Sequence, residues 1–302
     1  MKEKNPSNNV INLPGKALLE RDTAVQKKSR KGKGKARVIA ITSGKGGVGK
    51  TNIVANLGFA FSRLGKKVLI LDADLGLGNL DVLLGLAPKY NLSHVISGEK
   101  AVRDITIEGP GNINILPASS GIQELTRLNR EQKIRILSEL DRMVDLVDVL
   151  LIDTAAGISS NVMYFNVTAQ EIMVVVTPEP TSITDAYALM KVLSVKYSER
   201  NFKLLVNMAA DAQEAYDVFR QLSLVSDRFL DIEMDYVGHV IFDKKMTTCV
   251  RHQKVMSEMY PHSEASICFG ALARKIGSTS GTRVPMEDTH FFWKQLFRNE
   301  LE

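Results

Sequence analysis

A glycine-rich loop that holds two lysines and a threonine is the part of this sequence best suited to chemistry. It reads Gly44-Lys45-Gly46-Gly47-Val48-Gly49-Lys50-Thr51 and fits the pattern G-x-x-x-x-G-K-[ST]. Glycines let consecutive backbone N–H groups point into one concavity, where they bind phosphate oxygens. In this pattern the final lysine, Lys50, reaches the β- and γ-phosphates, and the hydroxyl of Thr51 binds Mg²⁺. The loop therefore predicts a nucleoside triphosphate site.

Two flanking segments must position this loop. Residues 37–43 form an apolar run typical of a buried β-strand, and residues 52–63 carry apolar side chains at helical spacing. A helix that begins at the loop adds the positive end of its dipole to the phosphate site. Strand, loop and helix thus follow one another as the motif requires. We predict that Gly44–Thr51 and the next residue, Asn52, bind the nucleotide.

Three aspartates lie at or just beyond the ends of two further apolar runs. The sequence predicts two further strands, residues 66–72 and 148–153, and each ends in an aspartate, Asp72 and Asp153. Asp74 follows two residues after the first strand. Parallel sheets bind ligands at the carboxyl ends of their strands. An aspartate in this position holds Mg²⁺ directly or through water, so we predict that Asp72 and Asp153 join Thr51 in the magnesium site. Asp74 is placed to orient or activate the attacking water.

Strands and helices alternate through the rest of the body. Further strands are predicted at residues 113–117, 172–177, 202–207 and 236–241, and helices at 129–146, 183–197 and 213–229. This alternation favours an α/β fold with a doubly wound, mostly parallel sheet and helices on both faces. We predict one P-loop domain over residues 37–280, with a tail at 1–36 and a separate segment at 281–302.

Charge is unevenly distributed along the 302 residues, whose formal net charge is +5. Residues 1–37 hold eleven of the 39 Lys and Arg but three of the 34 Asp and Glu, so the tail carries the basicity and the body is mildly acidic. We expect the tail to be disordered. A solubilising arm and a segment that binds an acidic partner, a membrane or nucleic acid are both open interpretations. The acidic body argues against nucleic-acid binding by the folded domain.

The sequence predicts a cytoplasmic protein. The N-terminus lacks the apolar stretch of a secretory signal, and the apolar runs are shorter than the roughly 20 residues of a membrane span. The two cysteines, Cys249 and Cys268, form no C-x-x-C pair, and we interpret them as free thiols.

The second lysine of the loop, Lys45, gives the sequence a family resemblance. The text K-G-G-x-G-K-T resembles the deviant Walker A loop of the SIMIBI class of P-loop NTPases, which includes MinD, ParA, the nitrogenase iron protein and the arsenite-pump ATPase. In that family the extra lysine reaches the nucleotide bound by the other subunit. The resemblance implies ATP and Mg²⁺ as cofactors and a homodimer in the ATP state. From the residues alone, a solvated loop lysine is the alternative for Lys45, and it is the less favoured interpretation.

Longer passages narrow the resemblance. Residues 72–81 look like the switch I segment of MinD-type ATPases and residues 153–159, with Gly157, like their switch II. The passages 49–52, 153–159 and 178–187 are more similar to the flagellar-number regulators called FlhG or FleN than to MinD. The resemblance covers roughly residues 37–253. It implies flagellar partners such as an FlhF-type GTPase, switch-complex proteins or a flagellar transcription regulator.

Two positions near the nucleotide base are carried over from the family. Asn207 matches the asparagine that reads adenine, and Asp74 matches the aspartate that positions water. Relatives have proline in G-x-I-P-x-D beside the base, whereas this chain has Ile241 there, which changes the expected shape of the pocket. An N-terminal motif by which some relatives stimulate FlhF is matched only at Asp22 and Ala24.

The segment 281–302 ends the chain with a dense aromatic stretch. On a helix, Phe292, Trp293, Leu296 and Phe297 share one face, which suits a membrane interface. The MinD group uses a C-terminal amphipathic helix in this way, so the resemblance implies reversible association with the inner face of the cell membrane. A helix docked on its own domain is the alternative.

The resulting expectation is a slow ATPase that acts as a dimeric switch in the control of flagellar number or placement. The alternative is a ParA-like partitioning ATPase that binds DNA non-specifically, which the acidic body disfavours. Metallocluster chemistry needs cysteines near the dimer axis, and Cys249 and Cys268 lie beyond the switch segments. A metabolic synthetase on the same fold is disfavoured by the passage 178–187.

Overall fold

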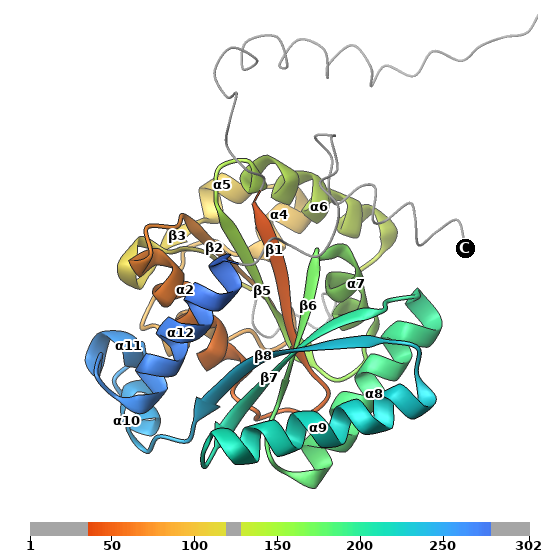
Figure 1. Ribbon diagram of the computed structural model, residues 1–302. Helices are drawn as coiled ribbons and strands as arrows, with labels where there is room; N and C mark the ends of the chain where they lie inside the picture. Colours follow the sequence, from red (N-terminus) through yellow and green to blue (C-terminus); the bar gives the residue numbers. More distant parts are fainter. Residues whose placement is uncertain (1–35, 119–127, 279–302) are drawn as a thin grey trace, which may run out of the picture. The chain divides into compact units, whose positions relative to one another are not determined.

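Runs of apolar residues pair into one sheet, which the computed structural model describes within residues 36–118 and 128–278. The strand order is β3-β4-β2-β5-β1-β6-β7-β8, and every pair is parallel except β3 with β4 (Figure 1). The strands are β1 (Arg37–Ser43), β2 (Val68–Ala73), β3 (Ile107–Glu108), β4 (Asn114–Leu116), β5 (Val149–Ala156), β6 (Glu171–Val176), β7 (Asn201–Ala209) and β8 (Glu233–Ile241).

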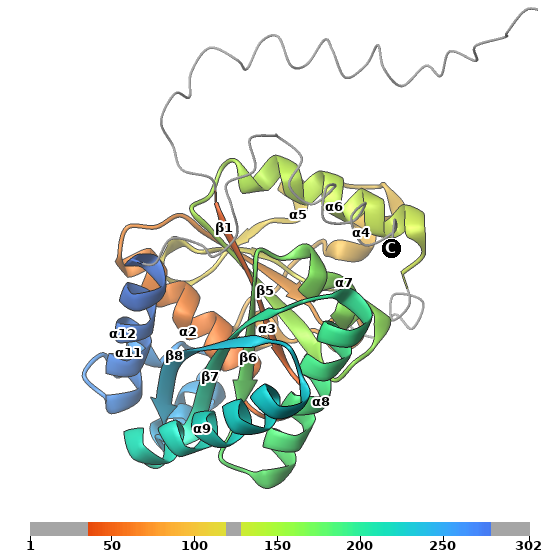
Figure 2. The same ribbon diagram turned by 45° about the vertical axis from the view of Figure 1, so that its right-hand side comes forward.

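Helices cover both faces of this sheet because its strands are apolar on both sides. In β1, for example, Ile39 and Ile41 enter one core cluster and Val38 and Ala40 enter another. The helices are α2 (Lys50–Arg63), α3 (Leu80–Leu83), α4 (Leu92–Ser97), α5 (Val102–Ile105), α6 (Arg130–Val144), α7 (Ser160–Thr168), α8 (Pro180–Tyr197), α9 (Ala212–Phe229), α10 (Lys245–Arg251), α11 (Met256–Met259) and α12 (Glu264–Ser278). Helices α2 and α12 pack together on one face, and α6 to α9 lie on the other (Figures 1 and 2).

Helix α2 is the element that fixes the loop in place. It begins at Lys50 directly after the loop, and its residues 53–61 are buried against the sheet. It ends in a Schellman arrangement, in which the Lys66 N–H donates to the Phe61 carbonyl and the Gly65 N–H to that of Ser62. A helix that is buried along its length and closed at its end gives the loop a rigid support.

The predicted fold class is confirmed, although the strand ends differ from the predicted ones by up to three residues and the short β3 was not predicted. Strand β5 continues to Ala156 rather than ending at Asp153, because Thr154 still pairs with Ala73 of β2 and Ala156 with Ser43 of β1. The predicted 281–302 segment lies outside the described residues, as does the 1–36 tail apart from Ala36. In the ranges that the structure covers, each helix is too short or too polar to cross a membrane.

Candidate functional site

The glycine-rich loop connects β1 to α2 at the carboxyl ends of the parallel strands. Gly49 is the N-cap of α2 with φ 86° and ψ 20°, and Lys50, Thr51 and Asn52 form the first turn. This turn carries no acidic residue, so the positive end of the helix dipole faces the loop without an internal counter-charge. The arrangement is a ready anion site, as the sequence predicted.

Two buried aspartates lie side by side next to this helix start. Asp72 on β2 and Asp153 on β5 are register partners, and they are 2% and 3% exposed. Burial raises the pKa of Asp72 above its usual range, and the nearby Asp153 carboxylate adds to the shift. Burial likewise raises the pKa of Asp153, although Lys50 and a hydrogen bond with Thr51 oppose the effect. The structure therefore brings together all three residues predicted to bind metal.

The donor atoms of this cluster suit a divalent cation. Among the described residues, Asp153 Oδ1 is buried without a hydrogen-bond partner. Two carboxylates that burial disfavours as anions, and one hydroxyl, are the hard oxygen ligands that Mg²⁺ prefers. Bound positive charge would offset the cost of keeping both carboxylates ionised. The residues present thus fit the ion that the sequence implied.

Asp74 extends the acidic cluster toward the surface. Its Oδ1 accepts a hydrogen bond from the Leu77 N–H at 3.1 Å, and its charge contributes to the raised pKa values of Asp72 and Asp153. Directly after β5 in the chain, the Gly157 N–H donates to the Ser43 carbonyl at 2.9 Å. The two predicted switch segments therefore converge on the phosphate-binding loop, and the water-positioning role of Asp74 stays a prediction.

Lys45 is held by its own chain. The Ser43 hydroxyl donates to the Lys45 carbonyl at 2.8 Å and fixes the backbone of the loop here. The Lys45 ammonium forms an ion pair with Glu179 and donates to Thr181 Oγ1 at 2.9 Å. Both partners belong to the start of α8, so Lys45 is neither freely solvated nor directed at the phosphate site of its own subunit.

Asn207 contacts the loop from β7. Its Nδ2 donates to the Val48 carbonyl at 2.8 Å, and the residue is 6% exposed. The following residue, Met208, has φ 59° at a point where the β7–β8 register shifts. Ile241 pairs with Ala209 at the end of β8. Asn207 thus anchors the loop, and the roles of Asn207 and Ile241 at adenine stay predictions.

A cavity of about 480 Å³ lies beside these residues. Its walls come from the loop after β6, the end of β7, the start of α9 and the residue after β8: Thr177, Pro178, Glu179, Met208, Ala210, Glu214 and Phe242. Sequence reasoning missed Met208 and Phe242, although each directly follows a predicted site residue, Asn207 and Ile241. The bulge that turns Met208 out of the ladder has no local sequence signal.

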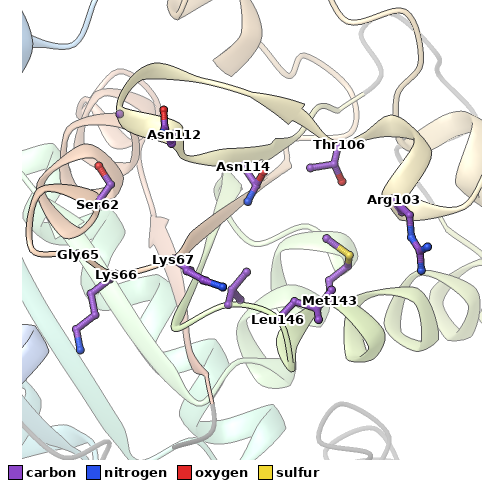
Figure 3. A pocket seen from close by; sticks show the side chains of 12 residues that line it. Ser62, Gly65, Lys66, Lys67, Arg103, Thr106, Asn112, Asn114, Met143 and Leu146 are labelled. Carbon is purple, nitrogen blue, oxygen red and sulfur yellow. The ribbon is translucent and has the colours of Figure 1, made fainter. Parts of the chain in front are cut away.

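A second cavity, of about 670 Å³, lies at the opposite end of the sheet. Lys66 and Lys67 precede β2, Asn114 begins β4, and Met143 and Leu146 line the far wall (Figure 3). No residue predicted from the sequence to bind nucleotide or metal lines it. This cavity is therefore separate from the phosphate-binding loop and the acidic cluster, which lie at the carboxyl ends of the strands.

The chain is similar to known proteins over most of its length. Residues 36–206 match the family model described as an AAA domain. The chain is 44% identical over 263 residues to the antiactivator FleN of Pseudomonas aeruginosa, covering 87% of this chain and 94% of the relative. It is 32% identical over 270 residues to the flagellum site-determining protein YlxH of Helicobacter pylori, covering 88% and 91%.

A solved structure shares the fold. The septum site-determining protein MinD of Pyrococcus horikoshii, complexed with Mg-ADP, superposes with a TM-score of 0.68 at 24% identity, covering 83% of this chain and 100% of that one. At this identity the likeness concerns the fold. The family match and the relatives that span most of the chain decide the family: the chain belongs to the AAA domain family, among its MinD/ParA-type ATPases.

Proposed function

We propose that this chain is an ATP-switched regulator of flagellar number or placement, which dimerises with ATP and resets by hydrolysis. The observation that carries the ATPase part is the convergence of Lys50, Thr51, Asp72 and Asp153 on one buried cluster at the start of α2. The flagellar part is supported by the similarity to FleN and YlxH over most of the chain.

Different residues of this chain would bind the phosphates, hold Mg²⁺ and orient the attacking water. The loop N–H groups and Lys50 bind the phosphate oxygens and neutralise their charge. Thr51, Asp72 and Asp153 would hold Mg²⁺, which when bound supplies positive charge to the β- and γ-phosphate oxygens. Asp74, at the outer side of the cluster, orients the attacking water through its carboxylate. The hydrogen bond from Asn207 to Val48 fixes the loop beside the cavity that Met208 and Phe242 line. We place the nucleotide base in this cavity.

Lys45 would act in the partner subunit. In the family, the lysine at this position reaches the nucleotide of the second subunit. Within residues 36–118 and 128–278, the Lys45 ammonium is bound by Glu179 and Thr181 rather than by the phosphate site of its own chain. Hydrolysis then depends on dimerisation, which makes the enzyme a switch.

The names of the relatives support a proposal for the partners, and the sequence of residues 281–302 supports one for the site of action. FleN is an antiactivator, which favours a flagellar transcription regulator as the partner of this chain, with an FlhF-type GTPase or switch-complex proteins as further candidates. Residues 281–302 would attach the ATP-bound dimer reversibly to the inner face of the cell membrane. Two such segments in one dimer bind lipid far better than one, because the second attachment is intramolecular.

The biochemical test compares the native chain with Lys50→Ala and Lys45→Ala. Lys50→Ala should lose ATP binding in calorimetry, because the cation that faces the phosphates is gone. Lys45→Ala should bind ATP as a monomer but neither dimerise in light scattering nor release phosphate. ATP-dependent dimerisation of Lys45→Ala at the native level would refute the cross-subunit role. The cellular test is the number of flagella after deletion of the gene, and an unchanged number and placement would refute the flagellar function.

A further inference from the structure

The ion pair between Lys45 and Glu179 holds the loop lysine away from the place where the proposed dimer needs it. We propose that Glu179 is a positioning residue that keeps Lys45 on its own subunit and so sets the threshold for ATP-dependent dimerisation. This inference rests on the proposed function, because it assumes that Lys45 acts across the dimer.

The start of α8 is built to present Glu179 to this lysine. Glu179 is the N-cap residue of α8, but its side chain makes no capping hydrogen bond. The turn before it is fixed by the Thr177 N–H, which donates to the buried Ser182 hydroxyl at 3.0 Å. The Glu179 carboxylate is therefore available to Lys45, on a backbone that cannot easily move.

Electrostatics make this carboxylate necessary for the observed position of Lys45. The first turn of α8 carries no acidic residue, so an ammonium group placed there meets the positive end of the helix dipole. Glu179 offsets that repulsion, and Thr181 Oγ1 accepts a second hydrogen bond from the same ammonium group. Without the Glu179 charge, Lys45 has little reason to stay at α8.

Glu179 also lines the cavity beside Met208 and Phe242. The Glu179 carboxylate thus lies between this cavity, where we place the nucleotide base, and Lys45, which we propose acts in the other subunit. Because its side chain is 60% exposed and that of Lys45 is 34% exposed, the pair can open without unfolding the loop. The contact therefore acts as a latch that weakens dimerisation without blocking it.

The expected size of the effect follows from the exposure of the pair. An exposed ion pair shifts an equilibrium by about 1.5-fold to 5-fold. Two pairs open per dimer, so Glu179→Gln should lower the dimer dissociation constant by roughly 2-fold to 25-fold. The difference should shrink at high salt, where exposed charges are screened.

The experiment measures dimerisation by sedimentation with Mg²⁺ and the non-hydrolysable ATP analogue AMP-PNP. The variants are Glu179→Gln and, as a matched control, Glu214→Gln. Glu214 lines the same cavity, but its carboxylate accepts from the Ala210 N–H at 2.6 Å, whereas Lys45 is bound by Glu179 and Thr181. Glu179→Gln should dimerise more tightly than the native chain at low salt, and Glu214→Gln should not. Equal dimerisation of the two variants would overturn the latch.

Lys45→Ala separates this inference from the proposed function. If Lys45→Ala dimerises as well as the native chain, the cross-subunit role of Lys45 is wrong. The proposed role of Glu179, which depends on it, is then wrong as well. If Lys45→Ala is a monomer, adding Glu179→Gln to it should restore nothing, because the residue acts only through Lys45. Dimerisation rescued in that double variant would show that Glu179 opposes the dimer by its own charge and would overturn the positioning role alone.

Discussion

Replacing Gly49 by alanine tests whether Asn207 anchors the phosphate-binding loop. Gly49 has φ 86°, and a Cβ atom there would lie 2.6 Å from Asn207 Nδ2. Gly47, in the same loop, has φ 80°, and a Cβ atom there would meet nothing within 4 Å. The two substitutions require a similar left-handed backbone, so Gly47→Ala is the matched control. They differ mainly in the contact with Asn207, since the other close atom at Gly49 is the end of the flexible Met208 side chain at 3.3 Å.

The magnitudes separate the two variants. An alanine held in the left-handed region destabilises the folded state by about 1–2 kcal/mol. Replacing glycine also lowers the conformational entropy of the unfolded chain, which offsets about 0.4–1 kcal/mol of this loss. We therefore expect Gly47→Ala to lose about 1 kcal/mol of unfolding free energy. Gly49→Ala also pushes the buried Asn207 amide off the Val48 carbonyl, and leaving buried polar groups unpaired costs a further 1–3 kcal/mol or so. Its total loss should be about 2–4 kcal/mol.

The assay is urea unfolding of the nucleotide-free protein, followed by far-ultraviolet circular dichroism. A drop in midpoint at constant slope reports stability alone. In an Asn207→Ala background the difference between Gly49→Ala and Gly47→Ala should vanish, since the partner of the clash is gone. If the two glycine variants differ by less than about 0.5 kcal/mol in the native background, the anchoring role of Asn207 is wrong.

Three further predictions concern the acidic cluster and the end of the chain. Asp74→Asn should keep the ATP affinity of the native chain in calorimetry yet release phosphate at least about 10²-fold more slowly. Phosphate release at the native rate would mean that another residue orients the attacking water. Burial raises the pKa of Asp72 and Asp153, so between the ordinary and the raised values the folded state binds more protons than the unfolded state. The protein in EDTA should therefore lose stability to urea from pH 5 to pH 9, less steeply in Asp72→Asn, whereas a rise over this range would contradict the shifts. A chain truncated after Pro285 should no longer sediment with anionic liposomes in ATP, and equal sedimentation would place membrane binding elsewhere.

The sequence by itself determined the fold class and the chemistry of the loop. Gly44–Thr51 between an apolar run and an amphipathic one is a local signal, because the loop's conformation depends on its own glycines and on the helix that it begins. The helix after the loop was predicted from Asn52 and begins at Lys50, and the strands that carry Asp72 and Asp153 were predictable from their apolar runs. The segment from α10 to α12 was not, since its packing against α2 and β8 follows no motif.

Only the tertiary structure decided how distant residues combine. Asp72 and Asp153 become neighbours because β5 inserts between β1 and β2, and that strand order is set by packing rather than by local sequence. The same applies to Asn207 on Val48 and to Lys45 on Glu179, which join the loop to β7 and α8. Sequence patterns report the faces of single strands and helices. Burial, pKa shifts and ion pairs depend on which strands adjoin, and this is fixed only when the sheet assembles.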